Sequence, residues 1–299
     1  MKIFITGGSG FIGADLSRYL LKEGHSVIAA GRSSSHKLAG HENFQYISVD
    51  TTQKGDWQNS LDKVDAAVNL AGRNILRLWT DSYKTQIYDS RILTTRNLVE
   101  AMPDNKGATL CSASAAGYYG NRDDETLKED ARPGDDFLAK VCIDWEKEAF
   151  QAETKGIRVV AMRFGVVLGK KGGALKKMLL AFKFFAGGPM GNGKHWFPWI
   201  HMDDLISAIL FILENREIKG PVNFCSPEPV RNMDFVKTFG NVLSRPSFMP
   251  APAFMIRLIM GELGASLLNS QRLIPDKLTR YSFKFQYPDV NSALSDILK

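Results

Sequence analysis

The 299-residue sequence predicts an α/β fold, a doubly wound parallel sheet with a smaller, mainly helical C-terminal subdomain. Two observations predict it. Short apolar runs of strand type alternate with longer amphipathic runs over roughly the first 165 residues. A glycine-rich segment directly follows the first of these strands. Repeated alternation of strands and helices implies parallel strands covered by helices on both faces.

Six apolar runs in the N-terminal part have the length and composition of buried strands. They are Lys2–Thr6, Ser26–Ala30, Phe44–Val49, Ala66–Leu70, Thr109–Ser112 and Arg158–Arg163. Four segments between them have the apolar spacing of helices. They are Phe11–Glu23, the short Asp56–Leu61, Asp81–Met102 and Asp136–Thr154. Gly24 ends the first helix, because glycine adopts the left-handed conformation of a C-cap without steric cost.

The chain changes character after Gly169, where frequent glycine and aromatic residues predict a loop over residues 170–200. Beyond it we expect a helix, a strand and two further helical segments. They are Asp203–Leu213, Val222–Phe224, Phe254–Leu268 and Asp289–Leu298. Three prolines between Pro246 and Pro252 interrupt regular structure. We therefore expect a larger sheet domain at 1–245 and a helical subdomain at 246–299.

The composition excludes several classes of protein. The formal net charge is +6, but lysines and arginines are scattered, so no nucleic-acid partner is expected. Cys111, Cys142 and Cys225 are widely spaced and form neither a disulfide framework nor a metal-ligand motif. No apolar stretch is close to the length of a membrane span, about 18 residues, and the N-terminus lacks a signal-peptide core. We expect a cytoplasmic protein with no membrane partner and no metal.

The segment Gly7-Gly8-Ser9-Gly10-Phe11-Ile12-Gly13 lies between the first predicted strand and the first predicted helix. In this context Gly7 permits a tight turn, Gly10 lets the backbone approach a pyrophosphate, and Gly13 allows close packing of helix on strand. The helix that starts at Phe11 and Ile12 offers backbone amides and a partial positive charge to phosphates. The sequence therefore predicts a dinucleotide site of the Rossmann type.

The second predicted strand is followed by Gly31-Arg32-Ser33-Ser34, where NAD-binding proteins carry an acidic residue for the adenosine ribose. Arg32 instead offers a planar guanidinium that can bind a 2′-phosphate, with the Ser33 hydroxyl in support. The alternative is a solvated loop arginine. The pattern favours NADP (NADPH) over NAD as the cofactor.

The chain resembles the extended short-chain dehydrogenase/reductase superfamily, whose TGxxGFIG motif is similar to residues 6–13. More narrowly, it resembles a poorly characterised family of sugar nucleotide epimerase-like NAD(P)-binding proteins with a C-terminal domain of unknown function. The stretches that carry the resemblance are Asn69–Ile75, Ser90-Arg91, Ser112–Gly120, Asp144-Trp145-Glu146, Arg163–Gly169, Gly187–Gly193, Trp199–Asp204 and Gln271–Lys277. The resemblance implies the fold and the cofactor class but no established reaction.

The resemblance also implies cofactor contacts beyond the glycine-rich loop. They are Arg32, Ser33, Asp50, Thr51, Leu70, Ala71, Gly72, Arg91 and Val166. Asp50 would contact the adenine, and Ala71 and Gly72 would offer backbone atoms beside the adenosine. Arg91 could equally be a surface residue of its helix, and Val166 could simply pack the last strand.

The catalytic residues of the superfamily are incomplete in this chain. Its members use a tyrosine general acid/base, a lysine four residues later that lowers the pKa of this tyrosine, and a serine on the preceding strand. Aligned on Glu146, the chain has Leu138 at the tyrosine position and Cys142 at the lysine position. Lys140 lies two residues from the lysine position, about 200° around a helix, so we expect it to face away.

Four residues are candidates for the remaining chemistry. Ser114 aligns with the superfamily serine, and Tyr118, or Tyr119 beside it, could donate a proton from another direction. Cys142 could act as a nucleophile if its thiol ionised. The alternative for Cys142 is a buried and inert thiol.

A substrate would meet aromatic and basic residues beyond the cofactor. The candidates are Arg163, His195, Trp196, Trp199 and Arg272, with the loop at 170–200 on the substrate side. Aromatic faces stack on a base or sugar, and arginines hold phosphate or carboxylate groups. The alternative is that the tryptophans form the hydrophobic joint between the two subdomains. For His201 we expect packing under the sheet edge, with Asp203 or Asp204 as a helix cap, rather than metal binding.

Two functions are consistent with these features. The first is an NADP-dependent oxidoreductase or epimerase-like enzyme acting on a small molecule, either nucleotide-sugar-like or a carbonyl compound. The second is a non-catalytic NADP(H)-binding sensor or regulatory protein, which the missing tyrosine and lysine motivate. The long helices at 81–102 and 136–154 could pair two chains in a homodimer.

Overall fold

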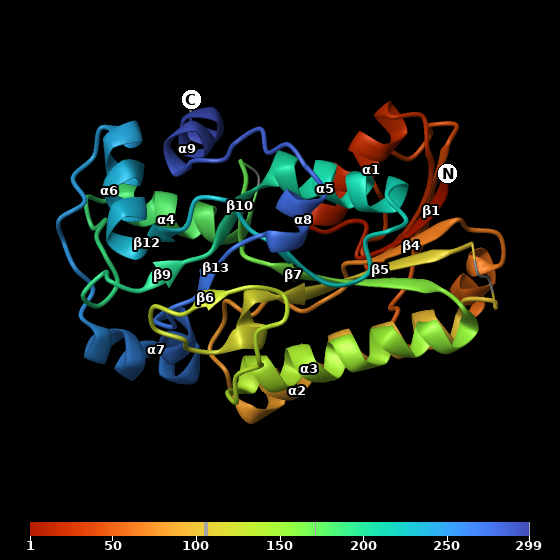
Figure 1. Ribbon diagram of the computed structural model, residues 1–299, viewed down its shortest axis with the longest axis horizontal. Helices are drawn as coiled ribbons and strands as arrows, with labels where there is room; N and C mark the ends of the chain where they lie inside the picture. The colour runs from red at the N-terminus through yellow and green to blue at the C-terminus, as the bar shows by residue number, and fades with distance from the viewer. Residues whose placement is uncertain (105–106, 171, 299) are drawn as a thin grey trace.

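The computed structural model describes residues 1–104, 107–170 and 172–298. A seven-stranded parallel sheet forms its centre, in the order β11-β7-β5-β4-β1-β2-β3 (Figure 1). The strands are β1 (Lys2–Thr6), β2 (Ser26–Gly31), β3 (Phe44–Ser48), β4 (Ala66–Asn69), β5 (Thr109–Ala115), β7 (Arg158–Phe164) and β11 (Gly220–Phe224). The chain runs from β1 out to β3 and returns to β4 on the other side of β1. The crevice between the carboxyl ends of β1 and β4 is therefore the switch point at which such folds bind ligands.

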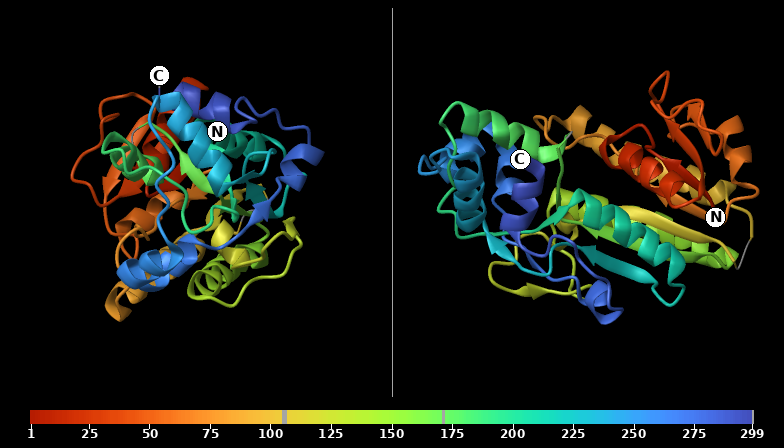
Figure 2. Two further views of the ribbon diagram at one scale, coloured as in Figure 1. Left: turned by 90° about the vertical axis from the view of Figure 1, so that its left-hand side faces the viewer. Right: turned by 90° about the horizontal axis from the view of Figure 1, so that it is seen from above.

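Helices cover both faces of this sheet, as the alternating sequence pattern predicts (Figures 1 and 2). They are α1 (Phe11–Lys22) and α5 (Met202–Glu214) on one face, and α2 (Asp81–Ala101) and α3 (Phe137–Phe150) on the other. Neighbouring side chains of β1 point to opposite faces. Ile5 packs in the core formed with α1 and α5, and Phe4 packs in the core formed with α2 and α3.

Three short strand pairs lie beyond the carboxyl edge of the sheet: β8 with β10, β9 with β12, and β6 with β13. Their bounds are β6 (Thr126–Leu127), β8 (Val166–Leu168), β9 (Trp196–Phe197), β10 (Trp199–His201), β12 (Val230–Arg231) and β13 (Arg272–Leu273). The described residues also form three 3-10 helices, η1 (Asp56–Leu61) before β4, η2 (Ala116–Tyr119) after β5 and η3 (Gln151–Lys155) before β7. The β6–β13 pair brings the C-terminal segment against the loop that follows β5.

The C-terminal part is helical and shares a second core with two earlier helices. Its own helices are α7 (Ala253–Leu267), α8 (Asp276–Arg280) and α9 (Val290–Leu298), and the earlier ones are α4 (Gly173–Lys183) and α6 (Asn232–Leu243). Leu175 of α4, Phe235 of α6 and Leu294 of α9 are buried together with Trp199. No helix within the described residues is long and apolar enough to cross a membrane.

The expected loop over 170–200 is wrong for residues 173–183, which form α4. The glycines that suggested a loop serve a tertiary contact instead. A Cβ at Gly172 or Gly173 would lie 2.8 or 3.0 Å from the ring of Phe11. The start of α4 therefore packs directly on the glycine-rich loop.

Candidate cofactor and catalytic site

The glycine-rich loop lines the switch point at the end of β1. Gly7 has a φ of +69°, and a Cβ on Gly13 would lie 2.3 Å from the carbonyl oxygen of Gly7. Larger residues would displace the backbone at both positions. Gly10 is the N-cap of α1 and offers no side-chain cap to the amides of the first turn. These amides, which include those of Phe11 and Ile12, are the donors that an anionic pyrophosphate requires.

The end of β4 forms the other wall of the crevice. The Thr6 hydroxyl donates to Asn69 Oδ1 at 2.6 Å, and the Ala71 amide donates to the same hydroxyl oxygen at 3.3 Å. A Cβ on Gly7 would lie 2.9 Å from the backbone of Leu70. Leu70 and Ala71 are half-buried and Gly72 is exposed, so the backbone after β4 lies open beside the loop.

Arg32 is exposed directly after β2 and forms no ion pair within the three described ranges of the chain. The Ser33 hydroxyl donates to Ser9 Oγ at 3.2 Å, which joins the segment after β2 to the glycine-rich loop. An anion at this loop would therefore lie close to an uncompensated guanidinium.

His36 also lies beside the glycine-rich loop. In the sequence, its position four residues after Arg32 is the one feature that points to it. Its Nδ1 accepts from the Leu38 amide at 3.2 Å, so its Nε2 carries the proton and lies 3.3 Å from the Gly8 carbonyl oxygen. Burial lowers the pKa of His36. The neutral imidazole thus holds the segment after Arg32 against the glycine-rich loop.

Arg91 is partly buried directly beneath Gly72. Its guanidinium donates to the carbonyl oxygens of Ile87 at 2.9 Å and Arg73 at 3.2 Å. A Cβ on Gly72 would lie 3.1 Å from Cζ of Arg91. Burial lowers the pKa of Arg91, which has no carboxylate partner in the described part of the chain. Arg91 therefore supplies a positive charge at the floor of the crevice.

The remaining predicted cofactor residues differ in their surroundings. Asp50 is exposed after β3 and accepts hydrogen bonds from the amide and hydroxyl of Thr52. Thr51 is buried, with its hydroxyl 3.1 Å from that of Thr94 on α2. Val166 is half-buried in β8, where it pairs with Trp199 of β10. Only Asp50 of these three presents its side chain to solvent.

Ser114 lies on β5 and faces helix α3. Its hydroxyl donates to Glu146 Oε1 at 2.7 Å and also contacts the thiol of Cys142. A Cβ on Gly117 would lie 3.1 Å from Cβ of Leu138, which places this residue against the end of β5. Leu138, Cys142 and Glu146 are spaced four residues apart and so share this face of α3. Lys140 is exposed and faces away, as expected.

Arg163 is 2% exposed and belongs to a buried network. Its Nε and Nη2 each donate to one oxygen of Glu146 at 2.8 Å, and its Nη1 donates to the Tyr119 hydroxyl at 2.9 Å and the Glu129 carbonyl at 3.0 Å. Burial alone would lower the pKa of Arg163, but the hydrogen bonds to Glu146 raise it above its ordinary value. Four of its five donors are used within the protein, so it positions Glu146 instead of facing a substrate.

The two tyrosines after β5 have different surroundings. Tyr119 is fully buried, its hydroxyl donates to Asn223 Oδ1 at 2.7 Å, and burial raises its pKa. Tyr118 is half-buried, and its ring centre lies 3.5 Å from Cζ of Arg163. Its hydroxyl makes no hydrogen bond to any described residue. Tyr118 is therefore the phenol that a bound molecule can reach.

Cys142 does not have the surroundings of a nucleophile. Burial raises the pKa of its thiol to about 11, and the nearby carboxylate of Glu146 acts in the same direction. The thiol is therefore protonated near neutral pH.

The predicted substrate residues lie at the joint between the sheet and the second core. Trp199 is 1% exposed and is part of that core. The ring of Trp196 already contacts two cations, because Cζ of Arg231 and of Arg272 lie 4.4 and 4.8 Å from its centre. The cavity beside the two tryptophans measures only about 10 Å³, room for one water molecule. The buried Nε2 of His195 and Nε of Arg272 have no hydrogen-bond partner there.

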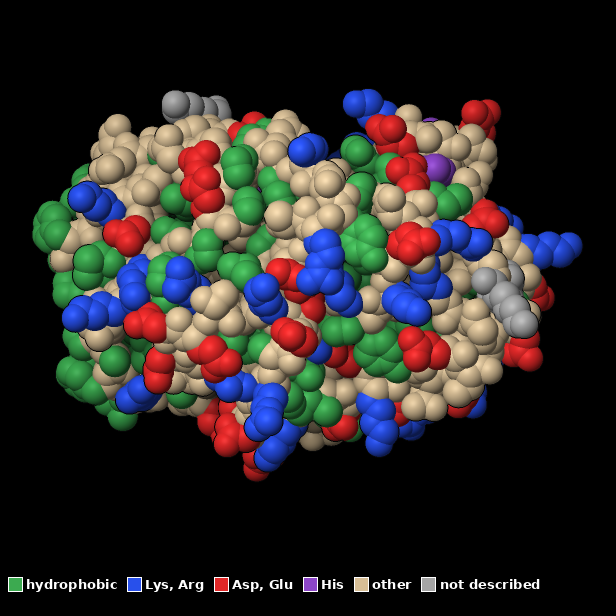
Figure 3. All heavy atoms as spheres, in the orientation of Figure 1, with side chains coloured by type: hydrophobic (Ala, Val, Ile, Leu, Met, Phe, Trp, Pro, Cys, Tyr) green, Lys and Arg blue, Asp and Glu red, His purple; other side chains and the backbone are tan. Residues whose placement is uncertain are grey.

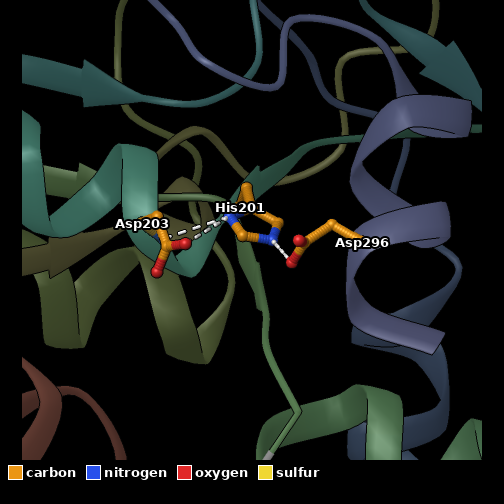
Figure 4. A group of neighbouring side chains, drawn as sticks. All are labelled: His201, Asp203 and Asp296. Carbon is orange, nitrogen blue, oxygen red and sulfur yellow. Dashed lines mark hydrogen bonds and ion pairs between the residues drawn. The ribbon is translucent and has the colours of Figure 1, made fainter. Parts of the chain in front are cut away.

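His201 caps α5 itself, which corrects the expectation that Asp203 or Asp204 does so. Its Nδ1 accepts from the Asp203 amide at 3.1 Å, whereas the Asp204 carboxylate binds the amides of Gln286 and Tyr287. Figure 4 shows the ring between two carboxylates, with Asp203 on the Nδ1 side and Asp296 3.4 Å from Nε2. Since the two acids meet opposite nitrogens of one ring, the arrangement does not fit a single ion.

The chain matches two protein-family models. Residues 3–225 match the NAD dependent epimerase/dehydratase family, and residues 251–297 match a domain of unknown function, DUF1731. The chain is 38% identical over 301 residues to epimerase family protein YfhF of Bacillus subtilis (strain 168), covering 100% of this chain and 98% of the relative. It is 37% identical over 305 residues to the chloroplastic epimerase family protein SDR39U1 homolog of Arabidopsis thaliana, covering 100% and 87%.

Solved structures agree with these matches. A crystal structure of human epimerase family protein SDR39U1 with NADPH is 32% identical, with a TM-score of 0.87 over 99% of both chains. UDP-glucose 4-epimerase of Thermus thermophilus, in complex with NAD, is 17% identical with a TM-score of 0.80 over 99% of this chain and 98% of that one, and shows the fold alone. The chain therefore belongs to the NAD dependent epimerase/dehydratase family of extended short-chain dehydrogenases/reductases, with a DUF1731 domain at its C-terminus.

Proposed function

We propose that this protein is an NADPH-dependent oxidoreductase or epimerase-like enzyme that acts on a small carbonyl or nucleotide-sugar-like molecule. The observation that carries the cofactor choice is Arg32, an exposed guanidinium directly after β2 with no ion-pair partner in the described part of the chain, where an NAD-specific site has a carboxylate. The relative of known structure at 32% identity was crystallised with NADPH. The tight glycine cradle and the uncapped start of α1 fit a dinucleotide pyrophosphate.

The residues after β5 support redox chemistry by an altered route. NADPH would supply a hydride to the substrate carbon. The Tyr118 hydroxyl has no hydrogen-bond partner among the described residues, and we assign it the proton that the substrate oxygen receives. Ser114 has one hydroxyl proton, which it donates to Glu146, so its oxygen accepts a hydrogen bond from a substrate hydroxyl.

A second candidate function is a non-catalytic NADP(H)-binding sensor. It is favoured by Leu138, an apolar residue packed at the place where the superfamily has its tyrosine. In this case the cofactor site would change the affinity for a partner and no turnover would occur.

Turnover assays separate the two functions. Purified protein is incubated with NADPH and a panel of ketones and enones, and separately with NADP+ and nucleotide sugars, with absorbance of NADPH and product analysis as readouts. Product analysis is needed because an epimerisation passes a hydride from the sugar to NADP+ and back, which leaves the absorbance unchanged. We expect turnover that falls at least about 100-fold in Tyr118→Phe, the contribution of a positioned acid. Tight NADPH binding with no product from any substrate, together with a partner whose binding depends on the redox state, would favour the sensor.

A further inference from the structure

One end of the molecule exposes large apolar side chains from two helices and the loop that leads to the second. We call this surface the apolar end. Its members are 43–80% exposed, and they are Leu180, Phe184, Phe185, Phe248, Met249, Phe254, Met255, Leu258 and Ile259. Figure 3 shows hydrophobic side chains gathered at the left-hand edge, the end that holds α6 and α7 in Figure 1. Exposed apolar groups of this extent mark interaction surfaces.

The two chain segments that carry the apolar end are joined by backbone hydrogen bonds and by one cation–π contact. The Met249 amide donates to the Gly187 carbonyl at 3.3 Å, and the Ala251 amide donates to the Pro189 carbonyl at 2.9 Å. Cζ of Arg245 lies 4.7 Å from the ring centre of Phe185. The segment that leaves α4 therefore lies beside the segment that enters α7, and the exposed residues of both form one surface.

Helix α7 buries little of its apolar surface in the protein. Of its fifteen residues only Ile256, Leu263 and Gly264 are buried. Phe254 and Leu258 are four residues apart, as are Met255 and Ile259, so each pair lies along one side of the helix. An amphipathic helix normally turns such a stripe toward a core. Here the stripe faces outward from the domain of unknown function.

Basic side chains lie beside the same surface. Residues 180–189 and 244–264 contain three basic side chains and one acidic side chain, a balance of +2. The basic residues are Lys183, Arg245 and Arg257. The one acid, Glu262, is paired with Lys84 of α2. An occupant of the apolar end must therefore be apolar at its centre and negatively charged around it.

We propose that the apolar end docks on an anionic lipid surface. Helices that lie in a membrane interface combine outward Phe and Leu side chains with Lys and Arg beside them, as α4 and α7 do. A second copy of the chain would bring the same three basic residues against these three, which disfavours self-association through this surface. Because the chain has no long apolar stretch, the sequence predicts no membrane partner. Docking of a helix in the plane of the membrane interface, however, needs no membrane-spanning helix.

Sedimentation with vesicles tests the docking. The full chain is mixed with vesicles of phosphatidylcholine alone or with 30 mol% phosphatidylglycerol, at low and high salt. We expect partitioning onto the anionic vesicles only, weakened by salt. The variant Phe254→Ser/Leu258→Ser should lower the partition coefficient more than tenfold. Lys183→Gln/Arg257→Gln should lower it about 25-fold, because each basic residue contributes about fivefold.

A matched control removes one exposed aromatic and one exposed lysine elsewhere, Tyr281→Ser/Lys22→Gln, and should bind as the unaltered protein does. Unchanged thermal unfolding midpoints show that each variant is folded. Absence of binding to anionic vesicles, or equal binding by the apolar variant, overturns the proposal. If light scattering instead shows a dimer that Phe254→Ser/Leu258→Ser dissociates, the surface belongs to a second copy. Salt-sensitive capture of an acidic protein without vesicle binding would assign it to a protein partner.

Discussion

The Ser114 hydroxyl donates a 2.7 Å hydrogen bond to Glu146, whose carboxylate is bound by two nitrogens of Arg163. The carboxylate thereby fixes the direction of the serine proton at the end of β5. Leu138 and Cys142 lie on the same side of α3 as Glu146, at spacings of four residues. The buried Glu146–Arg163 ion pair therefore determines how Ser114 is hydrogen-bonded.

Replacing Glu146 by alanine should destabilise the fold strongly, because it leaves the charge of Arg163 buried without a partner. The expected loss is about 3–5 kcal/mol in the free energy of unfolding, measured by urea denaturation. Glu148→Ala is the matched control, because Glu148 of the same helix forms a more exposed ion pair with Arg96 of α2. That change should cost about 0.2–1 kcal/mol. Equal losses in the two variants would contradict the buried network.

Gly13→Ala should damage the glycine-rich loop, because its Cβ would lie 2.3 Å from the Gly7 carbonyl oxygen. We expect a loss of about 1–3 kcal/mol in stability and a weakening of NADPH binding of at least about tenfold. Gly55→Ala provides the control, since a Cβ there would lie 3.9 Å from its nearest neighbour. Calorimetric titration and thermal unfolding measure both effects. Unaltered NADPH affinity in Gly13→Ala would argue against a cofactor at this loop.

The three cysteines should be inert in the folded protein. Burial raises the pKa of Cys111 to about 12 and of Cys142 to about 11, and it also raises the pKa of Cys225. A disulfide reagent at pH 8 should label almost none of them until urea unfolds the chain, when all three react. Cys142→Ala should retain NADPH binding and any turnover. Rapid labelling of Cys142 in the native state would contradict this prediction and would support a nucleophilic role for Cys142.

Stability should fall as the pH is lowered from 7 toward 5, and His201 contributes to this. Burial lowers its pKa below the ordinary value of about 6.5, although Asp203, Asp204 and Asp296 act in the opposite direction. As the pH falls, this histidine is protonated in the unfolded chain before it is protonated in the folded protein. The stabilisation is therefore complete above the pKa of the unfolded state and is lost as the pH falls through the pKa of the folded state.

His201→Asn removes the titrating ring but keeps an oxygen that can cap α5. Urea denaturation of this variant at several pH values should give a flatter dependence below pH 7 than the unaltered protein gives. His41→Asn, at an exposed histidine, should leave the dependence as it was. A dependence that is equally steep in His201→Asn would exclude His201 as its source.

The sheet could be predicted from sequence because its signals are local. Alternating apolar runs identified the seven main strands, and the glycine spacing identified the loop that the structure places at the switch point. Helix α6 was not predicted. It contains Gly240, a poor helix former, which is needed because a Cβ there would lie 2.7 Å from the Arg245 carbonyl oxygen. A tertiary contact thus overrides local propensity.

The candidate site was predictable only in part, because side chains distant in sequence decide it. Arg163 and Trp199 suggested substrate contacts by residue type alone. The first is bound to Glu146, seventeen residues earlier on a helix, and the second lies in a core formed by three helices. Neither contact produces a periodic pattern in the sequence. In the sequence, Glu146 serves only to align the chain with the superfamily motif. Its contacts with Ser114 and Arg163 follow from how α3 packs on β5 and β7.

The assignment of NADPH as the cofactor is tested most directly by the dissociation constants of NADPH and NADH. They are measured for the unaltered protein and for Arg32→Asp. The unaltered protein should bind NADPH at least about tenfold more tightly than NADH, because a guanidinium–phosphate pair contributes about 1.5–3 kcal/mol. Arg32→Asp should weaken NADPH about 10- to 100-fold and leave NADH nearly unchanged. Arg77→Asp, at another exposed arginine, should affect neither. Equal affinities in the unaltered protein, or an equal loss of both cofactors in Arg32→Asp, would contradict the assignment.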